Sequence, residues 1–261
     1  MNGKSQLTLV KIGGNVISDE NKLNDFLNDF AKIKGRKVLV HGGGKLATEM
    51  AEKLGIASKM VDGRRITDKA SLDIITMVYG GLINKKIVAH LQKNGCNALG
   101  LSGADINCIE ATKRPIKAVD YGYVGDIEQL NHDAFGFLLE KGITPVLCPI
   151  THDGGGQLLN TNADTIAAEV AISLSKLYKT TLFYCFEKNG VLKDINDKES
   201  LISHIDKKSY KALIEKGIIK DGMLPKLHNC FHALEKGVSK VCLGNEKMIV
   251  NTVENHTFLT L

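Results

Sequence analysis

The segment His41-Gly42-Gly43-Gly44-Lys45 follows directly on the apolar run Val38-Leu39-Val40. Apolar residues at helical spacing come next, so the pattern predicts a strand, a glycine turn and the start of a helix. Such a turn presents free backbone N–H groups at a helix N-terminus, where a phosphate or a carboxylate binds well. Glycine suits this position because a Cβ would block the close approach of an anion. Taken alone, the segment fits a plain chain-reversing loop equally well.

Chain length and composition limit the class of protein. The 261 residues, 43% of them hydrophobic, suffice for one large α/β domain or for two lobes with a sizeable core. The N-terminus shows no secretion or anchoring signal, and no uninterrupted apolar run is long enough to span a membrane. We therefore expect a cytoplasmic protein that has no membrane partner.

Charge and cysteine usage narrow the class further. The net charge of +5 is spread over the whole chain and only 5% of the residues are aromatic, so no basic stripe or set of stacking rings indicates nucleic-acid binding. A mild positive excess suits small anionic ligands instead. The six cysteines include no C-x-x-C pair, which predicts reduced, mostly buried thiols rather than a disulfide framework or a zinc site.

Strand and helix patterns alternate along the chain. Strands are expected at 7–12, 38–40, 98–101, 143–148, 181–185 and 240–243. Helices are expected at 23–33, 46–54, 67–90, 135–139 and 166–177, with two more toward the C-terminus. This alternation predicts an α/β fold in which a mostly parallel sheet is covered by helices on both faces. A shallow boundary near 177–181 could divide two lobes.

Three local features are expected within this framework. The long helix would begin with Thr67 as its N-cap and bury one face, formed by Leu72, Ile75, Val78 and Leu82. A hairpin is expected at 59–66 around the turn Asp62-Gly63, and an antiparallel β excursion at 107–128. The glycine turn 153–156 would lead through Leu158-Leu159 into the helix that ends near residue 177.

Other glycine-rich signatures are met in part or not at all. A P-loop is absent because Leu46 follows Gly44-Lys45. Gly42, Gly44 and Ala47 fit the dinucleotide pattern G-x-G-x-x-A, with Asp62 as the later acidic residue, so a nicotinamide-dependent dehydrogenase is an alternative. That match is weak because Asp62 falls in an expected turn rather than at the end of a second strand. An esterase would need a G-x-S-x-G elbow, which the chain does not supply.

Two further elements place charge beside bare backbone. Lys11 ends an apolar strand and Gly13-Gly14 follow it, which sets an ammonium group at the carboxyl edge of the sheet. For this lysine alone, reaching into solvent is the simpler alternative. The cluster Asn160-Thr161-Asn162-Ala163-Asp164 opens a helix, and capping explains Asn162 better than it explains the whole cluster. With the first glycine turn, these elements indicate an anion site.

Five motifs stand in order along nearly the whole chain: Lys11-Ile12-Gly13-Gly14, His41-Gly42-Gly43-Gly44, Gly63-Arg64-Arg65-Ile66-Thr67, Asn160-Thr161-Asn162-Ala163-Asp164 and Asp221-Gly222-Met223-Leu224-Pro225-Lys226. Jointly they resemble the acetylglutamate kinases of the amino acid kinase family. The resemblance implies a three-layer sandwich with a mostly parallel central sheet and helices on both faces. It implies one amino acid kinase domain, 1–261, whose N-terminal lobe (1–178) binds the acylglutamate and dimerises and whose C-terminal lobe (179–261) binds ATP.

The resemblance also implies roles for single residues. Lys11 and Lys226 would neutralise the transferred phosphoryl group, and Asp164 would hold both ammonium groups. The acylglutamate site would consist of Gly43, Gly44, Arg65 and Asn160. The nucleotide site would consist of Gly13, Gly14, Glu187, Gly190, Leu192, Ile218, Ile219, Lys220 and Met223. No side chain is expected to bind a metal, because Mg²⁺ would be held mainly by the ATP phosphates.

The implied reaction is ATP-dependent phosphorylation of the side-chain carboxylate of N-acetyl-L-glutamate, in arginine biosynthesis. A carboxylate with a pKa of about 4.3 is ionised at neutral pH, so the acceptor needs no general base. The obstacle is repulsion between this carboxylate and the triphosphate, which lysines, backbone N–H groups and Mg²⁺ would offset. N-succinylglutamate stays open as the substrate, because neither 102–107 nor 121–126 distinguishes the two acyl groups.

The chain departs from the family pattern in two places. Relatives usually read Ser-Asp-Val where this chain has Phe186-Glu187-Lys188, so the acidic residue is kept while its neighbours change. Only residues 1–6 precede the first expected strand, so the long N-terminal helix of arginine-inhibited hexameric members is missing. We therefore expect a homodimer that is insensitive to arginine.

Overall fold

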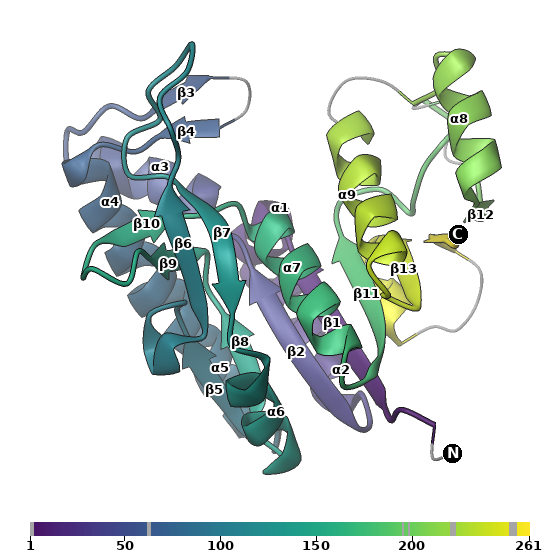
Figure 1. The fold of residues 1–261 in the computed structure, drawn as a ribbon, viewed down its shortest axis with the longest axis horizontal. Coiled ribbons are helices and arrows are strands. Elements are labelled where there is room, and N and C mark those ends of the chain that lie inside the picture. The colour runs from purple at the N-terminus through teal and green to yellow at the C-terminus, as the bar shows by residue number, and fades with distance from the viewer. Residues whose placement is uncertain (1–2, 62–63, 195, 198, 220–222, 251–254) are drawn as a thin grey trace.

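The computed structural model describes residues 3–61, 64–194, 196–197, 199–219, 223–250 and 255–261. A central sheet runs through the molecule, and its strands from edge to edge are β12 (His204–Ile205), β14 (Thr257–Leu259), β13 (Lys240–Gly244), β11 (Lys179–Cys185), β1 (Gln6–Ile12), β2 (Arg36–His41), β8 (Thr144–Leu147) and β5 (Ala98–Leu101) (Figure 1). All neighbouring pairs are parallel except β13 with β14. The expectation of a mostly parallel sheet is confirmed.

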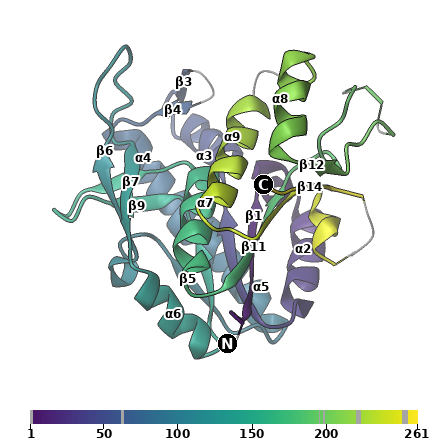
Figure 2. The same ribbon diagram turned by 45° about the vertical axis from the view of Figure 1, so that its right-hand side comes forward.

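Helices cover both faces of this sheet, so the expected three-layer arrangement is confirmed (Figures 1 and 2). One face is covered by α1 (Gly14–Ser18), α2 (Glu20–Lys32), α3 (Gly44–Lys53), α4 (Lys69–Ile75) and α5 (Asn84–Lys93). The other is covered by α6 (His132–Glu140), α7 (Ala163–Ser175), α8 (Lys207–Glu215) and α9 (Met223–Glu235). Two short 3₁₀ turns, η2 (Asp105–Asn107) and η3 (Glu246–Ile249), connect elements.

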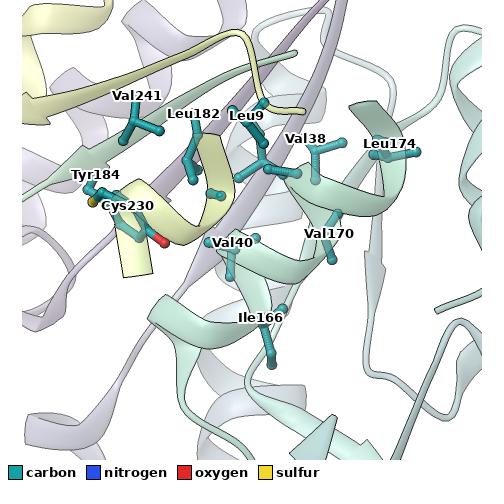
Figure 3. Packing of buried hydrophobic residues seen from close by; sticks show 14 of the residues in the cluster. Leu9, Val38, Val40, Ile166, Val170, Leu174, Leu182, Tyr184, Cys230 and Val241 are labelled. Carbon is teal, nitrogen blue, oxygen red and sulfur yellow. The ribbon is translucent and has the colours of Figure 1, made fainter. Parts of the chain in front are cut away.

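The two cores follow from the alternation of side chains along the central strands. In β1, Leu7 and Leu9 face the α7 side, whereas Val10 and Ile12 face the α2 side. Figure 3 shows the first of these cores, in which Leu9, Val38 and Val40 from the sheet meet Ile166, Val170 and Leu174 from α7. Because β1 also pairs with β11, the sheet continues across the expected lobe boundary at 178–179.

Antiparallel structure is added beside the carboxyl edge of the N-terminal strands. A second sheet contains β10 (Leu158–Asn160), β9 (Ile150–His152), β6 (Ile109–Lys113) and β7 (Gly125–Leu130). A separate hairpin contains β3 (Lys59–Val61) and β4 (Arg64–Ile66), while its expected turn at 62–63 lies outside the described residues. Both β excursions are confirmed. Leu158-Leu159 lead from the turn 153–156 toward α7 as expected, and they also form β10 by pairing with β9.

The long helix expected at 67–90 consists of three parts. α4 is followed by the π-helical segment η1 (Thr76–Ile83) and then by α5. Its N-cap is Asp68 and not Thr67, because the Asp68 carboxylate accepts a hydrogen bond of 2.8 Å from the Ser71 N–H. Leu82 was expected to be buried but is 40% exposed. The extra residue in each π turn rotates the helix, so that Ile83 is buried in its place.

Other expectations concern single side chains. Leu54, the last residue of the helix expected at 46–54, is exposed, and α3 buries Ala47 and Ala51. All six cysteines are free and buried, as expected. In the described ranges, no helix combines the length and the apolar character needed to cross a membrane.

Candidate active site

Asp164 lies between two lysines at the carboxyl edge of β1. One of its carboxylate oxygens is 2.6 Å from the Lys11 ammonium, and the other is 3.0 Å from the Lys226 ammonium. The three residues come from β1, from the first turn of α7 and from the first turn of α9. The structure therefore brings together the three residues that were expected to be catalytic.

The two lysines keep the Asp164 carboxylate ionised. Burial alone would raise the pKa of the Asp164 carboxyl, but attraction to Lys11 and Lys226 outweighs it and lowers the pKa to about 2. The side chains of Lys11 and Lys226 are 12% and 22% exposed, so both lysines are partly accessible to a ligand. Two cations and one anion leave a net positive charge, which suits a phosphoryl group.

Local structure fixes the position of each member of the triad. Asn162 caps α7, because its side-chain oxygen accepts hydrogen bonds from the N–H groups of Asp164 and Thr165. The Tyr184 hydroxyl donates a hydrogen bond of 2.9 Å to the Asp164 carbonyl. The Lys226 ammonium lies 5.6 Å from the centre of the Tyr184 ring and 5.8 Å from that of Phe186, within cation–π range. Tyr184 was not identified from the sequence, because it looks like an ordinary strand residue.

Two glycine turns flank the triad. Gly13 and Gly14 begin α1 directly after β1, and a Cβ at Gly13 would lie 3.9 Å from the Lys11 ammonium. Gly43 and Gly44 begin α3 directly after β2, and no side chain caps this helix. The two turns are joined because the Gly42 N–H donates a hydrogen bond of 3.0 Å to the Ile12 carbonyl. This hydrogen bond holds the two turns next to each other at the carboxyl ends of β1 and β2.

Arg65 binds the helix that begins at the second glycine turn. Its guanidinium donates hydrogen bonds to the Ser58 hydroxyl, to the Thr48 hydroxyl at 2.6 Å and to the Gly44 carbonyl at 3.1 Å. These contacts hold the Arg65 guanidinium against the first turns of α3, next to Gly44. Thr48 and Ser58 were not identified from the sequence, because nothing in their local pattern marks them as partners of an arginine.

Asn160 lies on the second sheet, between the triad and the β3–β4 hairpin. Its side chain donates a hydrogen bond of 3.0 Å to the Thr67 hydroxyl, and its backbone N–H binds the Tyr123 carbonyl. Thr67 directly follows β4, which contains Arg65, and it exchanges backbone hydrogen bonds with Tyr121 and Tyr123. The contact of Asn160 with Thr67 therefore links β10 to the strand that carries Arg65.

A cavity of about 390 Å³ opens beside the first glycine turn. Its lining residues are Gly13, Gly14, Asn15, Val16, Cys185, Phe186, Glu187 and Lys188. A smaller cavity of about 210 Å³ continues along Glu187, Lys188, Asn189 and Leu192. Four residues expected at the nucleotide therefore line these cavities: Gly13, Gly14, Glu187 and Leu192.

Other residues expected at the nucleotide are placed differently. Gly190 is buried against Thr257, where a Cβ would lie 2.8 Å from the Thr257 nitrogen. Ile219 is 2% exposed and packs in the core, whereas Ile218 and Met223 are half-buried. Lys220 lies outside the described residues.

Comparison with known proteins now gives the family. The sequence pattern of the amino acid kinase family matches residues 6–245. The chain belongs to the amino acid kinase family. An acetylglutamate kinase from Bacteroides fragilis is 56% identical over 240 residues, which is 92% of either chain. One from Cytophaga hutchinsonii is 52% identical over 254 residues, covering 97% of this chain and 96% of the relative.

Solved structures support the same fold for this amino acid kinase. The protein smu.665 from Streptococcus mutans matches with a TM-score of 0.78 and 25% identity, covering 97% of this chain and 98% of its own. Carbamate kinase from Giardia lamblia, solved with AMP-PNP, matches with a TM-score of 0.69 over 99% of each chain. At 12% identity the second likeness shows the fold alone.

Family membership also decides the fold and the dehydrogenase alternative. The expected amino acid kinase fold is confirmed, and the partial G-x-G-x-x-A match at Gly42 belongs to the glycine turn of an amino acid kinase rather than to a dehydrogenase. The acidic residue of that match, Asp62, lies outside the described residues.

Proposed function

We propose that this protein is an acetylglutamate kinase, which transfers the γ-phosphoryl group of ATP to the side-chain carboxylate of N-acetyl-L-glutamate. Relatives of this name match at 50–56% identity over nearly the whole chain. The observation that carries the chemistry is the contact of Asp164 with both Lys11 and Lys226. The reaction would place the protein in arginine biosynthesis.

The site is suited to joining two anions. The acceptor carboxylate is ionised at neutral pH, so no side chain has to remove a proton. The positive charge of Lys11 and Lys226 would stabilise the phosphoryl group as it moves between the two oxygens. Asp164 keeps the ammonium groups at fixed positions, and it stays ionised because its pKa is about 2. Catalysis would then rest on positioning and on charge stabilisation.

The two substrates would approach from opposite sides of the triad. Arg65 and Asn160, with Gly43 and Gly44, support an acylglutamate site in the N-terminal lobe, 1–178. The cavities lined by Gly14, Phe186 and Leu192 support an ATP site that belongs mainly to the C-terminal lobe, 179–261. The N–H groups of Gly14 and Gly44 would bind the phosphates between them.

Mg²⁺ would accompany ATP and neutralise charge on its phosphates. The described residues contain no group of three carboxylate, histidine or cysteine side chains arranged to hold a metal ion. That the ATP phosphates hold this ion stays part of the proposal. The homodimeric state, the cytoplasmic location and the insensitivity to arginine stay predictions, which sedimentation and inhibition assays can test.

The direct test is ATP-dependent formation of an acyl phosphate that hydroxylamine traps. N-acetyl-L-glutamate and N-succinyl-L-glutamate are assayed in parallel, with the Lys226→Ala variant as the control for contaminating kinases. We expect a higher kcat/KM with the acetyl substrate, since the relatives at 50–56% identity carry that name. A higher kcat/KM with the succinyl substrate would assign N-succinyl-L-glutamate as the substrate instead. No trapped product from either compound would overturn the proposed function.

A further inference from the structure

The side chain of His41 is buried beneath the second glycine turn. His41 is the last residue of β2, and it is 0% exposed. Its Nδ1 lies 2.7 Å from the Gly42 carbonyl oxygen, and its Nε2 lies 3.1 Å from Nδ2 of Asn84. Asn84, which begins α5, is 1% exposed and also donates a hydrogen bond of 2.9 Å to the Val146 carbonyl. These contacts form a polar network in an otherwise apolar core.

The network allows one arrangement of protons. Oδ1 of Asn84 accepts a hydrogen bond of 3.2 Å from the Lys85 ammonium, so Nδ2 is the atom that faces Val146 and His41. Because Nδ2 can only donate, Nε2 of His41 must accept and carries no proton. The neutral imidazole then carries its proton on Nδ1, where the Gly42 carbonyl accepts it. Burial supports this state, since desolvation lowers the pKa of His41 to about 4.

The hydrogen bond from His41 fixes the plane of the next peptide. In a trans peptide the C=O and N–H groups point in opposite directions. The Gly42 carbonyl points inward to His41, so the Gly43 N–H of the same peptide points outward, away from the core. The Gly43 carbonyl accepts from the Ala47 N–H at 3.0 Å, which directs the Gly44 N–H out of the helix N-terminus. Neither N–H binds another described backbone or side-chain acceptor.

We infer that His41 is a positioning residue: its Nδ1–H holds the Gly42 carbonyl inward and so aims the Gly43 N–H at the phosphoryl group in transfer. The inference rests on the proposed function and adds the Gly43 N–H to the donors already expected from Gly14 and Gly44. Asn84 is part of the same device, because it selects the tautomer that can donate to Gly42. Gly100 leaves room for the Asn84 side chain, because a Cβ at position 100 would collide with that side chain.

Two variants of His41 separate this role from a structural one. His41→Asn keeps an N–H donor near the position of Nδ1, whereas His41→Leu removes it, and both lose the contact with Asn84. Removing one preorganised donor to a developing anion costs roughly 10² to 10³ in kcat. We expect kcat of His41→Leu to lie at least about tenfold below that of His41→Asn, with the KM for ATP within about threefold. Equal kcat values in the two variants would overturn the inference.

A control and a measurement on the unaltered protein complete the test. Thr144→Val removes another buried hydrogen bond, from Cys96 at 3.5 Å, and should lower stability without changing kcat. If His41→Leu does not fold, long-range ¹H–¹⁵N spectra of the wild-type imidazole still report the tautomer. A proton on Nδ1 alone supports the inference, and a proton on Nε2 at neutral pH overturns it. Because these spectra need no turnover, they also distinguish this inference from failure of the proposed kinase activity.

Discussion

One carboxylate oxygen of Asp164 lies 2.6 Å from the ammonium group of Lys11. The other oxygen reaches Lys226, which comes from a helix much later in the chain. A single carboxylate therefore sets the distance between two cations that would otherwise repel each other. This geometry carries the first two predictions.

Asp164→Asn keeps the shape of the side chain but removes its charge. The two ammonium groups would then separate, and we expect kcat to fall at least about 100-fold, as for other misplaced catalytic groups. The KM for N-acetyl-L-glutamate should change little, because Arg65 and Asn160 are untouched. Steady-state kinetics give the result, with Asp29→Asn, which breaks an exposed pair with Lys32, as the matched control. Activity above a tenth of wild type would contradict the role given to Asp164.

Lys226→Ala removes one of the two cations that face the phosphoryl group. We expect turnover to fall by roughly a thousandfold, the scale known for a cation aimed at a transferring phosphoryl group. Binding of N-acetyl-L-glutamate, measured by calorimetry, should survive. Lys32→Ala serves as the control, since that side chain is 71% exposed and pairs with Asp29. Loss of acylglutamate binding in Lys226→Ala would argue against separate binding sites for the acylglutamate and ATP.

Gly43→Ala tests the conformation of the second glycine turn. Gly43 has φ +157°, and an added Cβ would lie 2.9 Å from the Tyr79 ring. Such overpacking costs about 1–3 kcal/mol, which corresponds to a fall in Tm of roughly 3–10 °C for a chain of this size. Gly80→Ala, whose Cβ would meet Ile150 at an ordinary 3.6 Å, should leave Tm nearly unchanged. Thermal unfolding monitored by circular dichroism compares the two.

Arg65→Lys keeps the charge but loses the planar fork that binds three groups at once. We expect the KM for N-acetyl-L-glutamate to rise at least about tenfold, with a smaller change in kcat, because the substrate carboxylate would lose a bidentate partner. Arg64→Lys, at the exposed neighbouring position, should behave like wild type. An unchanged KM in Arg65→Lys would remove this residue from the acylglutamate site.

Stability should depend on pH through His41. Desolvation lowers its pKa from 6.5 to about 4, and repulsion from Lys85 lowers it as well. The hydrogen bond to Gly42 raises the pKa but does not offset the burial. The unfolded chain therefore binds more protons between pH 6.5 and 4, so the free energy of unfolding falls as the pH falls through this window. The loss is roughly 3 kcal/mol. Denaturant titrations at several pH values should show a smaller loss in His41→Asn; an equal loss would assign the effect to other groups.

Several features could be predicted because their cause is local. Gly13, Gly14, Gly43 and Gly44 follow apolar runs, so their places at the ends of β1 and β2 could be inferred from the order of residues. The cap formed by Asn162 was expected for the same reason. By contrast, the choice between the adjacent caps Thr67 and Asp68 depends on a distant partner. The Thr67 hydroxyl accepts a hydrogen bond from Asn160, and the Thr67 backbone pairs with Tyr121 and Tyr123.

Features that depend on distant partners could not be predicted. The π-helical η1 inserts between two α-helical segments that read as one continuous pattern, so Leu82 was placed on the wrong face. The contact of His41 with Asn84 joins β2 to α5, and neither local pattern names the other residue. The Tyr184 hydroxyl of β11 donates a hydrogen bond to the Asp164 carbonyl of α7, so this contact joins the sheet to the helix layer.

The sequence by itself determined the α/β order, the glycine turns and the identity of the charged residues, because strand and helix periodicity and glycine conformation are properties of neighbours along the chain. Only the tertiary structure decided how those charges meet. Lys11, Asp164 and Lys226 come together because parallel strands and the first turns of α7 and α9 share one edge of the sheet. The tautomer of His41 was decided in the same way, by a buried partner that folding alone supplies.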